Sequence, residues 1–481
     1  MKGHNVIAFQ TKSFVRTKIL CTIGPATGSL QTLKNLIKQG MNAARLNFSH
    51  GSHDDHSKMY KSIRKASDDL GAFIPIVQDL QGPKIRVGNL SESEIRLKKG
   101  NTIRLTSKKI KGTAEVISTT YKNLPKDVKK DSTILLDDGL IRLTVIDIRN
   151  NEVVCRIVEG GILKPNKGIN LPGVDISSPS LTKKDRKDLK LGLSLGVDYV
   201  ALSFVRSPDD IRQLRKAMVQ YGKVVPIIAK IEKSEAVDQI EEIIRESDVI
   251  MVARGDLGVE VPSEDVPLIQ KMIINKCNRI GKPVITATQM LESMIQNPTA
   301  TRAETSDVAN AVLDGTDVVM LSGETSIGKH PIAAVRTMNN VLRKTEGALT
   351  FTYREQVEMQ SDIAVDAIGK AACILSERIS AAAIVPITHE GTTARVLAKF
   401  RPRALILATT ANRDTAHRLN LVWGVQPLLI SKLADTDTTL ENIESEIADS
   451  RKIKKGSYVV YTAGMPMEIM GKTNMVKVSK I

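Results

Sequence analysis

The sequence predicts an α/β protein in which a parallel (β/α)8 barrel carries a small inserted all-β unit and is followed by an open α/β unit. Three observations support this prediction. From about Thr17 to Ser322, short apolar runs alternate with stretches of helical period, as in a parallel sheet buried on both faces. Between Gln81 and Leu171 the helical stretches stop. Beyond about Thr345, strands and helices alternate again.

The barrel is predicted from eight apolar runs that each end in polar or glycine-rich residues. Helical stretches such as Leu30–Gln39, Ser207–Gln220 and Val266–Asn278 lie between most of these runs. Eight such strand–helix units close into a TIM barrel, whose active site lies at the carboxyl ends of the strands. The expected strands are Thr17–Gly24, Ala43–Ser49, Pro75–Asp79, Val197–Phe204, Val225–Glu232, Asp248–Asp256, Pro283–Gln289 and Asp317–Ser322.

The segment after Gln81 is predicted to be a β domain inserted in a βα loop on the active face of the barrel. It contains short strands, with Asp137-Asp138-Gly139 and Asn150-Asn151 at positions where hairpins would turn. The expected strands are Ile95–Leu97, Thr102–Leu105, Thr133–Leu136, Leu140–Ile148 and Glu152–Glu159.

The C-terminal unit is predicted to be an open α/β layer. Its expected strands are Ala382–Pro386, Ala404–Ala408, Pro427–Ile430 and Tyr458–Thr462, and its expected helices are Asp362–Glu377, Thr393–Lys399, Thr415–Leu421 and Thr438–Asp449. The predicted boundaries give a barrel at residues 1–82 and 178–348, a β lid at 83–177, and a C-terminal domain for effector binding and oligomerisation at 349–481.

Composition limits the classes of function. The 481 residues include 42% hydrophobic and 25% charged residues, which is typical of a globular protein of several domains. No apolar run approaches the roughly 18 residues that span a bilayer, and the first residues lack the apolar core of a signal peptide. The four cysteines lie far apart, which argues against a disulfide framework. We therefore expect a cytoplasmic protein with no membrane partner.

The formal charge of +16 raises the alternative of a nucleic-acid-binding protein. Such a footprint needs clustered basic residues, usually with aromatic side chains that stack on bases. Aromatic residues make up only 3% here, and Lys and Arg are spread along the whole chain. We therefore expect no nucleic-acid partner. A steep salt dependence in filter binding would favour the alternative.

Polar residues at alternate positions follow several of the predicted strands. Lys230 and Glu232 are two apart and so share one face of their strand. A single strand of this kind could simply lead into a solvent-exposed loop. Four strands that each end in alternating polar residues favour a shared site at the carboxyl ends of the barrel strands. The other residues with this spacing are Arg45, Asn47 and Ser49, Arg254 and Asp256, and Ser322 and Glu324.

These residue types suit a metal-assisted reaction of a small anion. Glu232 and Asp256 supply two carboxylates, the usual protein share of a magnesium site. Lys230 and Arg45 supply fixed positive charge, which phosphoryl transfer needs in order to stabilise its transition state. The residues alone leave phosphoryl transfer and enolate chemistry open.

Seven motifs resemble the pyruvate kinase family in order and spacing, and the likeness extends over nearly the whole chain. Runs of this length in this order are specific, whereas a lone GDLG would be weak. The motifs are Arg45–Gly51, Gln81–Arg86, Ala229–Glu232, Met251–Pro262, Thr286–Met294, Thr301–Gly315 and Met320–Thr325. The resemblance implies magnesium-dependent transfer of a phosphoryl group from phosphoenolpyruvate to ADP, yielding pyruvate and ATP, which is the last step of glycolysis.

One alternative within enzymes is a barrel lyase or mutase that acts on phosphoenolpyruvate or an oxo acid. Such an enzyme would use the same kind of residues to bind a metal ion and an anion but would use no nucleotide. The β insert argues against it, and formation of ATP from phosphoenolpyruvate and ADP would decide between the two.

The resemblance also implies a role for each site residue. Glu232 and Asp256 would hold Mg²⁺, which Mn²⁺ could replace. Lys230 would neutralise the transferring phosphoryl group, and Arg45 would grip the phosphate. The amides of Gly255 and Asp256, with the Thr288 hydroxyl, would bind the substrate carboxylate. The network that protonates the enolate would include Thr288, Ser322 and Glu324. The nucleotide would lie beside Asn47, His50 and Arg86.

One departure from the family pattern concerns a monovalent cation. Family members that need potassium hold it with an Asn, a Ser, an Asp and a Thr, and carry Glu at the position of Lys84. Asn47, Ser49 and Asp79 are present here, but Leu80 replaces the Thr and Lys84 replaces the Glu. We expect the Lys84 ammonium to stand in for the cation, so that activity does not require potassium.

The loop after the first C-terminal strand resembles the effector loop of allosteric pyruvate kinases. It offers backbone amides and hydroxyls to a phosphate at the start of a helix. Glu390 stands where the family usually has a serine, and a carboxylate repels an anion. The resemblance implies a phosphorylated effector of open identity and a homotetramer. The expected effector residues are Thr388, Gly391, Thr392, Thr393, Gly464, Gly471 and Thr473.

Overall fold

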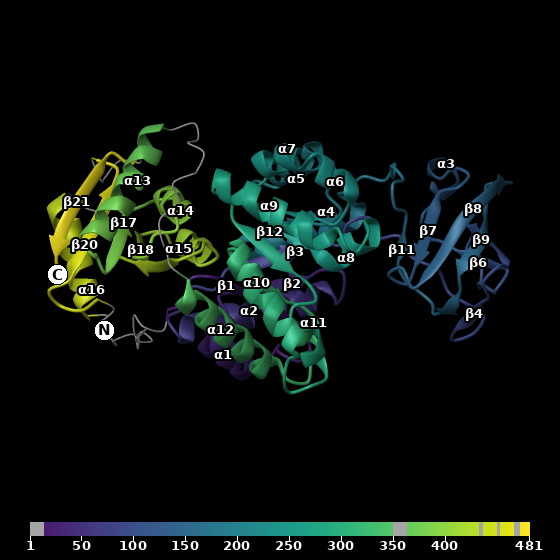
Figure 1. Ribbon diagram of the computed structural model, residues 1–481, viewed down its shortest axis with the longest axis horizontal. Helices are drawn as coiled ribbons and strands as arrows, with labels where there is room; N and C mark the ends of the chain where they lie inside the picture. The colour runs from purple at the N-terminus through teal and green to yellow at the C-terminus, as the bar shows by residue number, and fades with distance from the viewer. Residues whose placement is uncertain (1–13, 350–362, 432–435, 450–452, 466–471) are drawn as a thin grey trace.

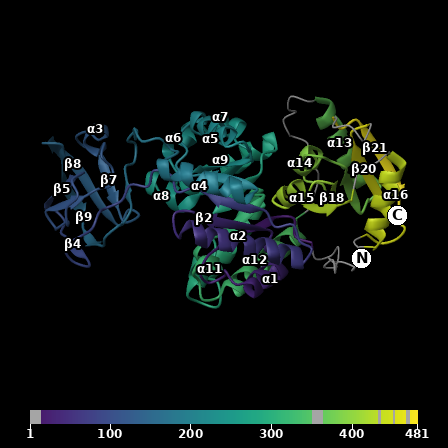
Figure 2. The same cartoon turned by 180° about the vertical axis from the view of Figure 1, so that it is seen from behind.

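The computed structural model describes residues 14–349, 363–431, 436–449, 453–465 and 472–481. These residues form three parts that lie in a row. The β insert lies at one end, the barrel in the middle and the C-terminal sheet at the other end (Figure 1). The reverse view shows the same order (Figure 2). None of the helices in the described residues is long and apolar enough to cross a bilayer.

The central part is a closed barrel of parallel strands in the order β1-β16-β15-β14-β13-β12-β3-β2. Nearly every strand residue is buried, as expected where helices cover the outside and side chains fill the inside. The predicted fold class is therefore confirmed. The strands are β1 (Lys18–Ile23), β2 (Ala43–Asn47), β3 (Ile76–Asp79), β12 (Tyr199–Leu202), β13 (Ile227–Ile231), β14 (Val249–Ala253), β15 (Val284–Ala287) and β16 (Val318–Leu321).

Helices surround the barrel. Capping boxes fix the starts of several of them. In α4 and α10, for example, the side chains of Thr182 and Thr301 accept hydrogen bonds from the amides of Asp185 and Glu304, whose carboxylates reach back. The helices are α1 (Leu30–Gln39), α2 (His53–Asp69), α4 (Lys183–Leu195), α5 (Pro208–Gln220), α6 (Ser234–Asp238), α7 (Ile240–Glu246), α8 (Arg254–Glu260), α9 (Val266–Ile280), η2 (Glu292–Ile295), α10 (Arg302–Asp314), α11 (Gly323–Ser326) and α12 (Pro331–Ala348).

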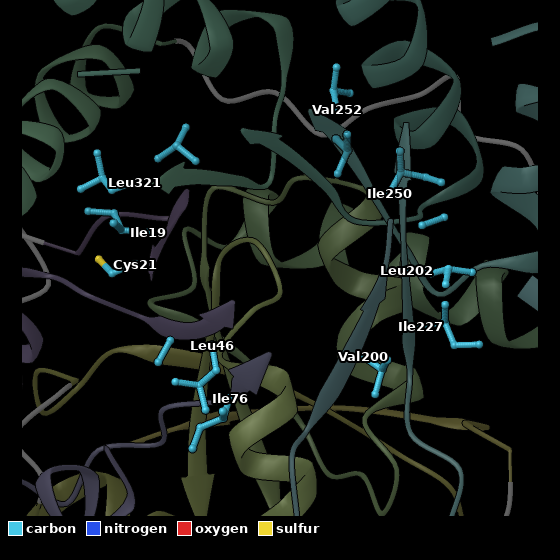
Figure 3. Close-up of a cluster of buried hydrophobic side chains, with 14 of the residues drawn as sticks. Ile19, Cys21, Leu46, Ile76, Val200, Leu202, Ile227, Ile250, Val252 and Leu321 are labelled. Atoms are coloured by element: carbon cyan, nitrogen blue, oxygen red, sulfur yellow. The ribbon is translucent and has the colours of Figure 1, made fainter. Parts of the chain in front are cut away.

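Alternate residues of each strand enter two different cores. Outward-facing side chains such as Ile19, Leu46 and Ile250 pack beneath the helices (Figure 3). Inward-facing side chains such as Leu20 and Ile228 fill the barrel interior. The interior core also contains Leu421 of the C-terminal unit. This unit therefore closes the amino-terminal end of the barrel, which we call the base.

The β insert contains a six-stranded sheet in the order β11-β7-β8-β9-β5-β6 and a small sheet of β10 and β4. Asp137, Asp138, Asn150 and Asn151 have positive φ, so both predicted hairpin turns are confirmed. The short helix α3 (Leu124–Asp127) was not predicted. The strands are β4 (Ile95–Leu97), β5 (Thr102–Thr106), β6 (Val116–Ser118), β7 (Thr133–Leu136), β8 (Ile141–Arg149), β9 (Glu152–Glu159), β10 (Gly161–Leu163) and β11 (Ile169–Asn170).

The C-terminal unit is a five-stranded sheet in the order β19-β18-β17-β20-β21. Its last strand is antiparallel to its neighbour and was not predicted. The strands are β17 (Ala383–Pro386), β18 (Leu405–Thr410), β19 (Val425–Leu429), β20 (Tyr458–Ala463) and β21 (Met475–Lys480). The helices are α13 (Ile363–Arg378), α14 (Thr392–Lys399), α15 (Arg413–Leu419) and α16 (Thr436–Asp449). The exact domain boundaries remain a prediction.

Candidate active site

The carboxyl ends of the barrel strands, which we call the mouth, bring charged side chains together. In β13, Ile228 faces the barrel interior while Ala229 and Ile231 pack outward. Lys230 therefore points inward at the mouth, and the side chain of Glu232 follows on the same side. The predicted shared face of Lys230 and Glu232 is confirmed by the ion pair between them, with Lys230 Nζ 2.7 Å from Glu232 Oε1.

A chain of alternating charges crosses the mouth. Arg45 Nε lies 2.6 Å from Asp79 Oδ2, and Lys230 Nζ lies 3.4 Å from Asp79 Oδ1. Arg45 also donates to the Thr22 hydroxyl at 2.8 Å. All of these residues are buried. The two cations lie on β2 and β13 and are held by Thr22 of β1, Asp79 of β3 and Glu232, so their positions are fixed before any ligand arrives.

The pKa values at the mouth reflect both burial and the pairing of opposite charges. Burial disfavours the charged form of Lys230, but Asp79 and Glu232 outweigh it and raise its pKa. Burial opposes the charge of Asp79, yet Lys230 and Arg45 hold its pKa below the usual value. Burial raises the pKa of Glu232, with a further contribution from the charge of Asp256. Glu232 thus lacks sufficient cationic compensation.

Asp256 does not lie on a strand, which corrects the sequence prediction. β14 ends at Ala253, and Arg254, Gly255 and Asp256 form the first turn of α8. Leu257 of this helix is buried in the outer core. The shared strand face predicted for Arg254 and Asp256 is therefore wrong. The amide of Gly255 instead donates to the Thr288 hydroxyl at 2.8 Å, at the start of the helix.

Arg254 is not a member of the mouth. Its guanidinium pairs with Asp307 at 2.8 Å and donates to the carbonyl of Thr288 at 2.7 Å. It therefore braces the loop after β15, where Thr288 and Gln289 both have positive φ. Such backbone strain persists only where surrounding contacts enforce it.

Ser322 and Glu324 also depart from the predicted strand pattern. β16 ends at Leu321, and Glu324 lies in the short helix α11, so these two residues do not share a strand face. Glu324 is buried and accepts hydrogen bonds from the amides of Leu291 at 3.1 Å and Ser322 at 2.7 Å. It joins the loop after β15 to the loop after β16.

The residues considered for a monovalent cation lie at the ends of β2 and β3. Asn47 and Asp79 are direct neighbours in the sheet register. Asn47 accepts from the amide of Ser49 at 3.1 Å. Leu80 is buried in the outer core, so its side chain offers no ligand. Lys84 is half-buried, and no ion pair to it is found among the described residues.

The residues considered for a nucleotide lie between the barrel and the β insert. His50 is exposed, and its pKa is lowered by partial burial and then by the charges of Arg86, Lys84 and Arg45. Arg86 donates to the Asn166 carbonyl at 2.9 Å. A hollow of about 490 Å³ nearby is lined by Lys84, Asp256 and insert residues such as Gly168.

Ser203 and Phe204 belong to the mouth but were missed in the sequence. The Ser203 hydroxyl accepts from Lys230 Nζ at 2.8 Å and donates to the Leu80 carbonyl at 2.7 Å. The amide of Phe204, a residue with positive φ, donates to Glu232 at 2.8 Å. Ser203 is a polar residue directly after the apolar run of β12, so the sequence pattern that marked the other mouth residues was present for it as well. The positive φ of Phe204 is visible only in the structure.

A second buried ion pair was also missed. Lys233 Nζ lies 2.7 Å from Glu260 Oε1, and both side chains are almost fully buried. Asn170 of the β insert donates to the same oxygen at 3.0 Å. The pair thus connects β13, α8 and the insert. No spacing rule could have linked three such distant segments.

Comparison with known proteins agrees with this geometry. Residues 14–335 match the family described as pyruvate kinase, barrel domain, and residues 366–479 match pyruvate kinase, alpha/beta domain. The chain belongs to the pyruvate kinase family. It is 46% identical to a pyruvate kinase of Staphylococcus saprophyticus over 96% of this chain and 80% of the relative. It is 45% identical to one of Staphylococcus aureus over the same shares.

A solved structure supports the same assignment. A pyruvate kinase from Cryptosporidium parvum superposes with a TM-score of 0.92 at 37% identity, covering 98% of this chain and 97% of that chain. The protein is accordingly a phosphotransferase that converts phosphoenolpyruvate and ADP to pyruvate and ATP in glycolysis. The predicted family and reaction are confirmed.

Pyruvate kinases are in general magnesium-dependent, and the mouth suits such an ion. In the described part of the chain, no three His, Cys, Asp or Glu side chains form a metal-binding group. Two carboxylates, Glu232 and Asp256, lie close enough for the charge of one to raise the pKa of the other. This arrangement fits Mg²⁺, which keeps open positions for water and substrate oxygens.

The residues of the predicted effector loop surround the start of α14. The amide of Gly391 donates to the Thr388 hydroxyl at 3.0 Å, and the hydroxyls of Thr393 and Thr473 are 2.6 Å apart. Thr392 is exposed and Gly464 half-buried. Gly471 lies outside the described residues. The loop therefore brings hydroxyls from two segments together, while Glu390 remains exposed beside them.

Proposed function

We propose that the charged chain at the mouth is the phosphoryl-transfer centre of this enzyme. One observation carries the proposal: the Lys230 ammonium lies buried between the carboxylates of Asp79 and Glu232, which keep it charged. Phosphoryl transfer spreads negative charge over the oxygens of the moving group. A preorganised ammonium beside that path lowers the barrier, and Arg45 grips the phosphate from the neighbouring strands.

We assign the divalent ion to Glu232 and Asp256. When bound there, Mg²⁺ would supply positive charge to the phosphate and carboxylate oxygens of phosphoenolpyruvate. The proximity of the Asp256 charge to Glu232 supports this assignment, and Mn²⁺ has similar ligand preferences. Glu232 keeps its orientation through the Phe204 amide.

The substrate carboxylate would lie at the start of α8. The amides of Gly255 and Asp256 and the hydroxyl of Thr288 meet there, and amides at a helix start favour an anion. Thr288 and Ser322 then bring a water to the enolate carbon. Glu324 acts as a positioning residue, because its two oxygens hold the backbones that carry them.

The nucleotide would occupy the space beside Asn47, His50 and Arg86. A lowered pKa keeps His50 neutral at physiological pH, so it can offer a hydrogen bond without adding charge. Arg86 supplies charge from the β insert, which we propose closes over the site as a lid.

Substitution of Lys230 by Met tests the centre. The variant loses a charge that acts in the transition state, so turnover should fall roughly a thousandfold or more. The KM values should change far less, because ground-state binding relies on other groups. Lys216→Met removes an exposed lysine of α5 and should leave turnover unchanged. An equal loss in affinity for phosphoenolpyruvate would make Lys230 a simple binding residue.

We propose further that the enzyme does not require potassium. Leu80 is buried in the outer core where a hydroxyl ligand would be needed, so the set of Asn47, Ser49 and Asp79 is incomplete. Arg45 and Lys230 already neutralise Asp79. The charge of Lys84 reaches His50 beside this cluster and can replace that of a monovalent cation.

Lys84→Glu tests the substitution. In the variant a monovalent cation becomes the remaining source of that charge, so activity should become dependent on potassium. The wild type should lose little activity in buffer free of sodium and potassium. Lys99→Glu reverses the charge of an exposed lysine in the insert and should create no such dependence. A wild type that needs potassium, or a variant that ignores it, would contradict the proposal.

Regulation and assembly follow the family expectation as proposals. The hydroxyls of Thr388, Thr392, Thr393 and Thr473 support binding of a phosphorylated effector, and Glu390 limits which anion fits. We also propose a cytoplasmic homotetramer without a nucleic-acid partner. Titration of sugar phosphates and nucleoside monophosphates into a steady-state assay tests the effector, and light scattering tests the tetramer.

A further inference from the structure

A second hollow, of about 270 Å³, lies at the base of the barrel, where the C-terminal unit packs against it. We call it the base cleft. It is distant from the mouth, because its barrel residues directly precede β15 and β16 and so lie at the opposite ends of the strands. Its charged and polar lining consists of Asn278, Lys282 and Asp317 from the barrel and Arg395, Lys399 and Arg401 from the C-terminal unit.

Both walls of the base cleft are in tight contact at Gly281. This residue has φ +84°, and a Cβ added to it would lie 2.8 Å from the Cβ of Lys399. Any larger residue would push α14 away from the barrel. The close approach therefore fixes the width of the cleft and depends on glycine at this position.

The base cleft contains more positive than negative charge. Lys399 pairs with Asp366 at 2.6 Å, and Arg401 Nη2 pairs with Asp317 at 2.8 Å. Lys282 and Arg395 have no carboxylate at ion-pair distance among the described residues. Lys282 donates instead to the carbonyls of Ser247 and Arg245, and Arg395 donates to the Glu390 carbonyl and the Thr392 hydroxyl.

Neighbouring charges do not remove this excess. Asp248 faces Lys282 and Arg395 but already pairs with Arg215 at 3.3 Å, and Arg418 adds a further positive charge. Burial is the largest cause that lowers the pKa of Lys282 and of Arg395. Lys282 is half-buried and Arg395 is exposed, and neither has a matching anion among the described residues. A cation that is partly buried without an anion is unfavourable unless a ligand supplies one.

The guanidinium of Arg401 provides the most specific evidence for a bound anion. The residue is only 6% exposed, yet its Nε and Nη1 atoms are buried and have no hydrogen-bond partner in the part of the chain that the structure describes. A buried donor without an acceptor costs roughly 1–3 kcal/mol. The guanidinium also lies over the ring of Trp423, 4.4 Å from its centroid, which fixes its plane.

We propose that the base cleft binds a small phosphate-bearing anion, held by Lys282 of the barrel and by Arg395 and Arg401 of the C-terminal unit. A planar guanidinium presents paired N–H groups that match two phosphate oxygens, so an anion there would satisfy the open donors of Arg401. The ligand would contact both parts and join the C-terminal unit to the base of the barrel.

This site is distinct from the predicted effector loop. Thr393 and Arg395 are two positions apart in α14, so their side chains point to nearly opposite sides of the helix. Thr393 contacts Thr473 in the C-terminal unit, whereas Arg395 faces the barrel base. The two sites therefore lie on different sides of α14, although Arg395 donates to the hydroxyl of Thr392 at the start of that helix.

The chain contains one tryptophan, Trp423, and its contact with Arg401 makes it a reporter of the base cleft. Inorganic phosphate titrated into the intact enzyme, at ionic strength held constant with chloride, should produce a saturable change in tryptophan emission. Arg395→Gln and Lys282→Gln each remove one charged donor and should weaken this binding roughly tenfold or more.

Two control variants separate the base cleft from other anion sites. Arg378→Gln removes an exposed arginine at the end of α13, and Thr393→Ala alters the predicted effector loop. Both should bind phosphate like the wild type, and Arg378→Gln should also keep the turnover of the wild type. A wild type without a saturable emission change would overturn the proposal. So would equal affinities of Arg395→Gln and Arg378→Gln.

The same titration identifies the source of the phosphate. A pentose phosphate and adenosine monophosphate are compared with inorganic phosphate on the wild type and on Arg395→Gln. Tighter binding of an organic phosphate, lost in the variant, assigns the site to that class. Equal binding of all three assigns it to the free anion.

Discussion

Two lysines point into the same barrel from opposite ends. Lys18 begins β1 at the base, and Lys230 lies near the end of β13 at the mouth. Their residues are 1% and 9% exposed. Each amino group donates to a neutral oxygen, that of Lys18 to the Val425 carbonyl at 2.6 Å and that of Lys230 to the Ser203 hydroxyl at 2.8 Å.

The pKa values of these lysines move in opposite directions. Burial lowers the pKa of Lys18 to about 7, and the more distant charge of Glu346 offsets this only in part. Burial also disfavours the charged form of Lys230, but the carboxylates of Asp79 and Glu232 raise its pKa. The difference comes from carboxylates at 3.4 and 2.7 Å, which Lys18 lacks.

The comparison shows that depth in a barrel does not decide the charge of a lysine. Neighbouring carboxylates do, and they are found at the mouth, where the chemistry needs a permanent cation. At the base, Lys18 is buried without a carboxylate at ion-pair distance among the described residues. This difference agrees with our proposals of a metal ion at the mouth and an anion at the base.

Glu232→Gln would leave Lys230 with less carboxylate charge beside it, as is the case for Lys18. We expect this variant to have the largest effect on turnover. The variant loses one metal ligand and one of the two carboxylates beside the ammonium. Turnover at fixed Mg²⁺ should fall on the order of a thousandfold. The pKa of Lys230 should fall, so the residual activity should decline with rising pH sooner than in the wild type.

A matched variant removes the neighbouring exposed carboxylate. Asp238→Asn lies at the end of α6, shortly after the same strand, and should retain wild-type turnover and pH dependence. The measurement is a pH–rate profile for each of the three proteins. An unchanged alkaline limb in Glu232→Gln would show that Asp79 alone keeps Lys230 charged.

Glu260→Gln extends the comparison to a third buried lysine. The substitution leaves Lys233 buried without its carboxylate, and removal of one partner of a buried pair costs about 3–5 kcal/mol. For a domain of this size the melting temperature should fall by roughly 5 to 15 °C. Glu264→Gln, on the exposed stretch before α9, should leave it unchanged. A wild-type melting temperature in Glu260→Gln would mean that Asn170 and nearby groups compensate the lysine.

The sequence predicted the barrel well because eight apolar runs recur and their carboxyl ends must meet. Lys230 and Glu232 were placed correctly by strand alternation. The rule failed for Asp256 and Glu324, since β14 and β16 end early and helices carry these residues. Alternation holds only inside a strand, and strand ends depend on contacts such as that of Glu324 with Leu291.

Contacts between distant segments could not be predicted. The Lys233–Glu260–Asn170 cluster joins residues far apart in sequence, and none of them follows a periodic pattern. The base cleft likewise forms only when α14 reaches Gly281. Such sites depend on how the parts pack, and that packing is set by complementary shape and not by local pattern.

Lys18→Met tests the base of the barrel and should have the smallest effect on turnover, because Lys18 lies at the end of the barrel opposite the mouth. At pH values below about 7, Lys18 is charged in both the folded and the unfolded chain, so its full burial cost is present. Between a pH of about 7 and the ordinary lysine pKa of 10.5, the folded chain releases the proton while the unfolded chain keeps it. Wild-type stability should therefore rise with pH in this window, by at most about 1.4 kcal/mol per pH unit from this group.

The Met variant lacks this contribution, so its advantage should shrink as the pH rises. The measurement is the melting temperature of Lys18→Met and of the wild type from pH 6 to pH 10, roughly the range in which this lysine titrates. The variant should exceed the wild type by most at the acid end of this range. Lys38→Met on α1 removes an exposed lysine and should show no such trend. A constant difference across the range would mean that Lys18 remains protonated in the folded enzyme, so that the carbonyl of Val425 and the charge of Glu346 suffice to keep a cation buried at the base.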